Sequence, residues 1–65
     1  MNTQEQLKFY GDIFFKAPKS KWEPEDIAII YALYNKVYNE NKQDTGCGSC
    51  RRETILAVKE AWIKL

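Results

Sequence analysis

The strongest hydrophobic pattern of the chain lies in its middle and predicts an amphipathic helix over residues 24–41. Apolar side chains recur there every three or four residues, which places them on one face of a helix. They are Ile27, Ile30, Tyr31, Tyr34, Val37 and Tyr38. Because Ile29 and Leu33 widen this face beyond a narrow seam, we expect the helix to form the centre of the core. Pro24, followed by two acidic residues, suits its first turn.

A shorter pattern predicts a first helix that begins near Asn2 and Thr3 and ends before Pro18. Its apolar face consists of Leu7, Tyr10 and Phe14. The polar residues at its start have the spacing of a capping box. Gly11 weakens this helix by about 1 kcal/mol relative to alanine. Two short strands around Gly11 are an alternative, but no alternation of apolar and polar residues supports them, so we favour the helix.

A third helix is predicted to begin between Thr45 and Cys50 and to run to the end of the chain. Its broad apolar face consists of Cys47, Cys50, Thr54, Val58, Ala61, Trp62 and Leu65. Leu56 and Ile63 fall nearly opposite, so this helix carries two apolar faces. One face can serve the core, and we expect Leu56 and Ile63 to form an interface between copies of the chain.

Three helical patterns without an internal repeat predict an all-α fold with one domain over residues 1–65. We expect a compact three-helix domain whose last two helices form a hairpin around the Cys47-x-x-Cys50 loop. A chain of this length buries only about 60% of the surface of its unfolded state. Such small domains usually need a disulfide, a metal or a partner subunit for stability, which favours a homo-oligomer.

The composition excludes several classes of function. Ten Lys and Arg against nine Asp and Glu give a net charge of +1, which argues against a nucleic-acid partner. The chain has no histidine, so His-based catalysis and His metal ligation are excluded. No apolar run approaches the roughly 20 residues of a membrane span, and the polar N-terminus is not a secretion signal. We therefore expect a cytoplasmic protein with no membrane partner and with reduced thiols.

Unusual chemistry is concentrated in residues 44–52, which contain both cysteines, two of the three glycines and two arginines. The Cys47-x-x-Cys50 spacing suits half of a zinc site, but a tetrahedral structural site needs four ligands. A four-cysteine site shared between subunits stays open, and we expect no cofactor or metal in a single copy. A redox pair is a second interpretation, because a helix N-terminus favours the thiolate. Thioredoxin-like enzymes place this motif in a βαβ unit, and no parallel strand pattern is visible here.

Two further interpretations of this segment are an anion site and a structural role. The candidate anion ligands are Gly46, Gly48, Ser49, Arg51 and Arg52. Their glycine spacing matches no Walker or Rossmann fingerprint. In the structural interpretation, which we favour, both cysteines pack against the core, and the arginines are solvated or pair with Asp44, Glu53 or Glu60. We expect no catalytic pair and no enzymatic activity.

The segment from Asp44 to Arg51, with the preceding helical residues 30–38, resembles a group of very small bacteriophage-encoded proteins. Their recurring features are a Tyr/Asn-rich helix, a short polar loop, a T-x-C-x-x-C-x-R motif and a final Lys-rich helix. The resemblance does not extend to the segment of the first helix. It implies a phage protein that acts in the bacterial cytoplasm or the virion, and it implies no ligand or activity for the motif.

These patterns together predict a small binding protein that self-associates. It would capture a host protein or a phosphate-bearing small molecule and so inhibit a host system or act as a sponge. A structural virion component, such as a decoration or connector subunit, is the alternative, and a thiol redox or zinc-binding protein is third. The tyrosines and tryptophans can stack on nucleobases, but we favour a place in the core or an interface.

Overall fold

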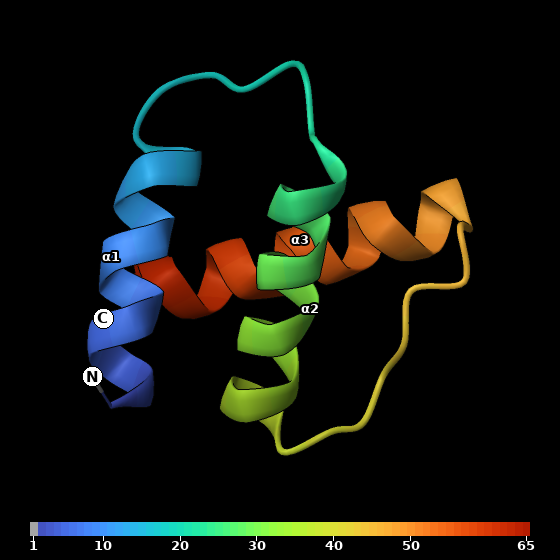
Figure 1. Ribbon diagram of the computed structural model, residues 1–65. Helices are drawn as coiled ribbons and strands as arrows, with labels where there is room; N and C mark the ends of the chain where they lie inside the picture. The colour runs from blue at the N-terminus through green and yellow to red at the C-terminus, as the bar shows by residue number, and fades with distance from the viewer. Residues whose placement is uncertain (1) are drawn as a thin grey trace.

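The computed structural model describes residues 2–65 and contains three helices (Figure 1). Helix α1 spans Thr3–Phe15, α2 spans Pro24–Tyr38 and α3 spans Gly48–Ile63. The predicted all-α three-helix fold is therefore confirmed, and the alternative of two strands around Gly11 is wrong. Met1, which the predicted domain included, lies outside the described residues.

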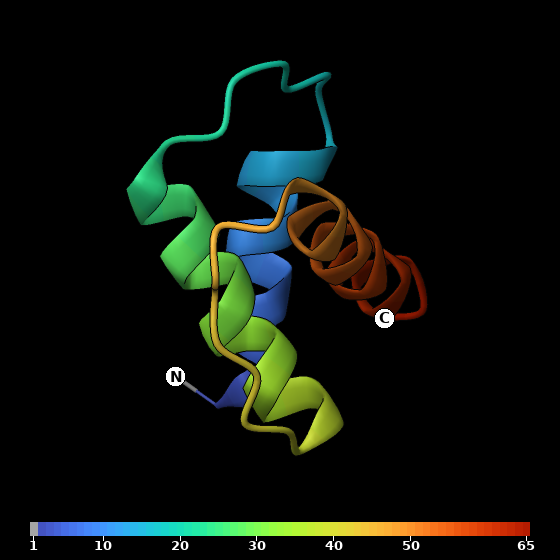
Figure 2. The same cartoon turned by 90° about the vertical axis from the view of Figure 1, so that its right-hand side faces the viewer.

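The three helices form two layers. Helices α1 and α2 run in opposite directions, and α3 crosses both of them (Figures 1 and 2). Each helix contacts the other two. The hairpin of α2 and α3 is an open one, because the segment between them carries the chain from one end of α2 to the far end of the crossing helix α3.

The helix ends follow from local hydrogen bonds. Asn2 caps α1 in the predicted capping box, since its side chain accepts from the N–H of Glu5 at 2.8 Å. Helix α2 ends at Tyr38 and not at the predicted residue 41. Asn39 adopts the left-handed conformation (φ 54°), which asparagine tolerates and which stops the helix.

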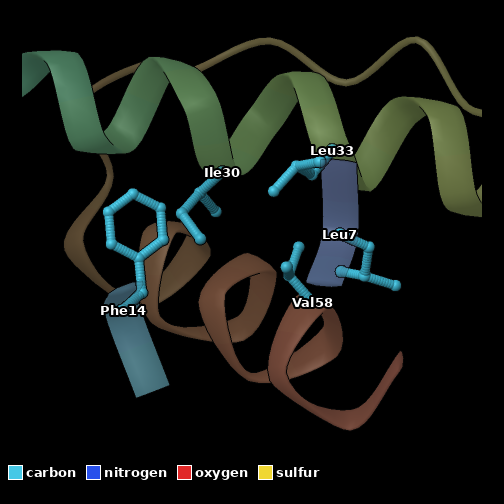
Figure 3. Packing of buried hydrophobic residues seen from close by; sticks show 5 residues of the cluster. All are labelled: Leu7, Phe14, Ile30, Leu33 and Val58. Carbon is cyan, nitrogen blue, oxygen red and sulfur yellow. The ribbon is translucent and has the colours of Figure 1, made fainter. Parts of the chain in front are cut away.

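The core lies where the three helices meet (Figure 3). Its buried members are Leu7, Phe14, Ile30, Leu33 and Val58. Ile30 and Val58 are completely inaccessible to solvent. As predicted, α2 occupies the centre and contributes the most buried residues. Tyr38 departs from the predicted stripe, because its ring is exposed and its hydroxyl donates to the carbonyl oxygen of Ala57 at 2.9 Å.

The glycine in the middle of α1 permits α3 to cross closely. Gly11 is buried beneath the indole ring of Trp62, and a Cβ atom there would lie 2.1 Å from the Cδ1 atom of that ring. The indole N–H donates to Asp12 Oδ1 at 3.0 Å and fixes the ring in this position. Leu65, which the pattern placed on the same face as Trp62, is instead exposed beyond the helix end.

Candidate functional site

The Cys-x-x-Cys motif forms the first turn of α3. Cys47 is the N-cap residue, and its sulfur accepts the backbone N–H of Cys50 at 3.2 Å. The hydroxyl of Ser49 lies 3.3 Å from the same sulfur. A thiol therefore holds the position that a Ser, Asp or Asn oxygen usually takes at a helix start.

The two thiols differ in acidity. Hydrogen bonds from the Cys50 thiol, the Ser49 hydroxyl and the Cys50 N–H lower the pKa of Cys47 to about 7. The hydrogen bond with Cys47 and desolvation raise the pKa of Cys50. Both cysteines are half-buried and lie outside the core cluster. The expectation that they pack into the core is therefore wrong, because the motif caps the helix at the edge of the domain.

An ion pair fixes the loop before this turn. Arg51 donates to both carboxylate oxygens of Asp44 at 2.8 Å, and the N–H of Gly46 donates to the same carboxylate at 3.0 Å. Gly46 has a positive φ of 82°, which suits glycine. Asp44 thus occupies two of the groups predicted to bind an anion, namely the Arg51 guanidinium and the Gly46 N–H. Within the described chain, Arg52 has no ion-pair partner.

The motif borders a surface hollow of about 310 Å³ between α2 and α3. Its lining consists of Trp22, Ile27, Gly48, Arg51, Arg52, Ile55 and Leu56. A neighbouring hollow of about 350 Å³ continues toward the end of α1. Its lining consists of Phe14, Phe15, Lys16, Ala17, Pro18, Lys19, Trp22, Ile55, Leu56 and Lys59. The two share Trp22, Ile55 and Leu56, and we call them together the Trp22 groove.

Trp22 is held in the groove by aromatic contacts. Its ring centroid lies 5.4 Å from that of Phe14 and 6.3 Å from that of Phe15. The ammonium of Lys19 lies 5.3 Å from the centroid of the indole. The otherwise irregular connector between α1 and α2 therefore presents a positioned, half-buried aromatic ring to the groove.

The groove concentrates positive charge in a chain that is almost neutral overall. Within the described chain, no acidic residue lines it. The five cationic residues of its lining are Lys16, Lys19, Arg51, Arg52 and Lys59. Three of them pair with Asp12, Asp26 and Asp44 outside the groove. Arg52 and Lys59 have no ion-pair partner in residues 2–65. These two cations of the groove are therefore available to an anion.

Sequence reasoning found only part of this site. Of the predicted anion ligands, Gly48, Arg51 and Arg52 line the groove, whereas Gly46 and Ser49 do not. It noted that the tryptophans can stack on nucleobases but favoured the core or an interface for them, and it assigned neither Trp22 nor the three lysines to the anion site. The sequence did contain a signal for this site. A tryptophan follows two lysines in the connector, and an ordinary loop does not require a tryptophan.

A buried hydroxyl without a partner lies near the same region. Tyr31 is 6% exposed, and within the described chain its hydroxyl has no hydrogen-bond partner. Its phenol is among the groups that raise the pKa of Arg51, after the dominant hydrogen bond from that guanidinium to Asp44. An unsatisfied buried hydroxyl costs about 1–3 kcal/mol.

Tyr31→Phe is therefore expected to increase the free energy of unfolding by about 1 kcal/mol. The substitution removes the desolvated hydroxyl and keeps the packed ring. Urea denaturation followed by circular dichroism measures the change. Tyr10→Phe, at a tyrosine that is only half-buried, is the matched control and should alter stability by less. A clear loss of stability in Tyr31→Phe would show that the hydroxyl has a partner.

Leu56 and Ile63 lie on the outer side of α3, as the pattern placed them. Their side chains are 53% and 65% exposed. They are seven residues apart, so they share one helix face. Leu56 also forms the edge of the Trp22 groove, which puts the groove next to the face predicted for self-association.

Within residues 2–65, no group of three or more Cys, His, Asp or Glu side chains could hold a metal ion, and none of the helices is long and apolar enough to span a membrane. Comparisons with protein-family models, with curated proteins and with solved structures found no match.

Proposed function

We propose that this protein is a small, non-enzymatic binding protein that captures a phosphate-bearing small molecule in the Trp22 groove. The observation that supports this proposal is that Arg52 and Lys59, two cations without an ion-pair partner in residues 2–65, line the same groove as the ring of Trp22. Removal of such a molecule from the cytoplasm of a bacterial host would make the protein an inhibitor or sponge of a host system. The resemblance to small phage proteins motivates that setting.

The cations are placed to receive phosphate oxygens. Arg52 and Lys59 are seven residues apart on α3, so they project from the same helix face on either side of Leu56. An arginine fork donates two parallel hydrogen bonds to a phosphate, and a lysine adds a mobile point charge. Because neither cation has an ion-pair partner in residues 2–65, an anion would replace water and not a protein carboxylate.

The apolar lining favours a ligand that also has a flat ring. Trp22, Ile55 and Leu56 belong to both hollows and form the apolar lining that the hollows share. Base–aromatic stacking contributes about 1–3 kcal/mol per base. The two hollow volumes lie at the small-ligand end of binding-site sizes, whereas a stable protein interface buries roughly 800 Å² on each partner. A nucleotide therefore fits the groove better than a host protein does.

Removal of both free charges is expected to abolish most of the binding. A nucleoside phosphate at about 100 times its Kd stabilises the folded state by about 2.7 kcal/mol, which raises Tm by about 10–20 °C in a domain of this size. Arg52→Gln with Lys59→Gln should weaken binding at least tenfold, since each charge-assisted hydrogen bond contributes about 1.5–3 kcal/mol. Thermal denaturation with a panel of nucleoside mono-, di- and triphosphates measures both effects.

The matched control removes two charges away from the groove, with Lys36→Gln and Lys64→Gln. It should bind as tightly as the parent. Adenosine and inorganic phosphate, tested separately, should each stabilise the protein much less than the nucleotide. Equal losses in both double variants would contradict a localised site. A parent that no nucleotide stabilises, but that is present in purified phage particles, would instead favour the structural virion component.

We also propose that two copies associate through the outer face of α3. Leu56 and Ile63 are both exposed on this face, so an antiparallel pair of α3 helices would remove them from water. Burial of each large aliphatic side chain would contribute about 1.5–3 kcal/mol. Such a contact would add stability to a domain whose own hydrophobic core is small.

Leu56→Glu with Ile63→Glu is expected to produce monomers. Sedimentation equilibrium over a concentration series measures the molecular mass. Phe9→Glu, at an equally exposed apolar residue of α1, is the control and should leave self-association unchanged. A parent chain that stays monomeric at the highest concentration would refute this interface.

A further inference from the structure

We propose that Cys47 and Cys50 are a redox-active dithiol that closes to an intrachain disulfide by exchange with a low-molecular-weight disulfide. Cys47 is the attacking residue and Cys50 the resolving residue. The reaction is stoichiometric and needs no substrate pocket, so it differs from the catalytic pair that the sequence argues against. It does not depend on the ligand of the Trp22 groove.

The first turn of α3 brings the two sulfurs within reach. The Cys47 sulfur accepts the backbone N–H of Cys50 at 3.2 Å, and the Cys50 thiol is also among the groups that donate to it, so the two thiols face each other across the turn. Both residues are half-buried, and Gly48 between them has open space around it. A small disulfide can therefore approach the turn without displacing core residues.

The environment assigns the two roles. Cys47 receives a backbone N–H and a neighbouring hydroxyl at the positive end of a 16-residue helix whose first turn contains no acidic side chain. These donors and the Cys50 thiol bring its pKa to about 7, near the pH of a cytoplasm. The pKa of Cys50 is raised, so this thiol stays protonated until Cys47 has reacted.

The exchange proceeds in two balanced steps. The Cys47 thiolate attacks one sulfur of the small disulfide, a mixed disulfide forms, and the first small thiolate leaves and takes up a proton. Cys50 then loses its proton and attacks the Cys47 sulfur, which expels the second small thiolate. Two protein thiols are oxidised, and one small disulfide is reduced to two thiols. Closure removes the free thiolate that caps the helix.

Reaction of the reduced, full-length chain with the chromogenic disulfide dithionitrobenzoate tests this assignment. The parent should release two thionitrobenzoate anions per chain and lose two hydrogens in mass, with no adduct retained. Cys50→Ser should release one anion and retain one adduct. Cys47→Ser should react about tenfold more slowly at pH 7, because desolvation and the nearby Glu53 still raise the pKa of the remaining thiol, while thiolate nucleophilicity rises only with a Brønsted slope of about 0.4–0.5.

The pH dependence separates this mechanism from simple exposure of two thiols. The initial reaction rate of the parent, in which the Cys50 thiol still donates to the Cys47 sulfur, should reach half of its maximum near pH 7. Circular dichroism of both serine variants confirms that the helices are retained. A parent that keeps two adducts, or serine variants that react at equal rates, would overturn the proposal. Disulfide-linked pairs of chains as the main product would overturn it as well.

Discussion

Gly11→Ala is expected to unfold most of the protein, although alanine is the better helix former. Alanine normally stabilises a helix interior by about 1 kcal/mol relative to glycine. Here the new methyl group would lie 2.1 Å from the Trp62 ring, so the ring must move away. The indole then loses its hydrogen bond to Asp12, and α3 loses its close contact with α1. We expect a net loss of about 3 kcal/mol or more, which approaches the whole stability of a domain of this size.

The other two glycines supply matched controls. Gly48→Ala introduces a methyl group into open space and should change stability little. Gly46→Ala meets no atom but must adopt a positive φ, so it should cost about 1–2 kcal/mol. Urea denaturation followed by far-ultraviolet circular dichroism measures all three. Addition of Gly11→Ala to Trp62→Leu should cost much less than Gly11→Ala alone, and a full additive loss would refute the steric account.

Phe14→Ala is expected to cost about 3–5 kcal/mol, the usual range for removal of a buried phenylalanine. Its ring is 4% exposed, and it contacts both the core and Trp22. The cavity would therefore weaken the helix packing and the floor of the Trp22 groove together. Chemical denaturation should show a variant that is largely unfolded at room temperature, with loss of the cooperative transition.

Phe9→Ala is the matched control for this substitution, because the same ring is removed from a side chain that is 52% exposed. We expect it to cost less than about 1 kcal/mol, since surface substitutions rarely have larger effects. Equal losses at Phe9 and Phe14 would contradict the assignment of the core. The difference between the two variants also reports how much of the stability depends on burial and how much on helix propensity.

The fold could be predicted because its helices follow local rules. The apolar spacing of α2, the capping box of α1 and the proline at the start of α2 all act within a few residues. The end of α2 was less predictable. Asn39 stops that helix, and the Asn35 side chain then binds the backbone of Lys42 through bonds of 2.8 and 2.9 Å.

The candidate site was less accessible to sequence reasoning, because its parts come together only in the folded chain. Trp22 lies in a connector, whereas Arg52 and Lys59 lie in α3, thirty or more residues later. Helical spacing correctly placed Leu56 and Ile63 on the outside of α3. It also assigned the cysteines to the apolar face, where the structure instead gives Cys47 the local role of a helix cap. No pattern of apolar residues encodes such a role.

The two tryptophans allow the proposed groove to be tested in one spectrum. Trp22 lines the groove, whereas Trp62 lines neither of its two hollows and its indole N–H donates to Asp12. A ¹⁵N–¹H correlation spectrum resolves both indole signals, and Trp22→Phe assigns them. On titration with the nucleoside phosphate that stabilises the protein most, the Trp22 signal should shift and saturate while the Trp62 signal stays in place. A Trp22 signal that does not move at saturating ligand, or a saturable shift confined to Trp62, would contradict binding in the Trp22 groove.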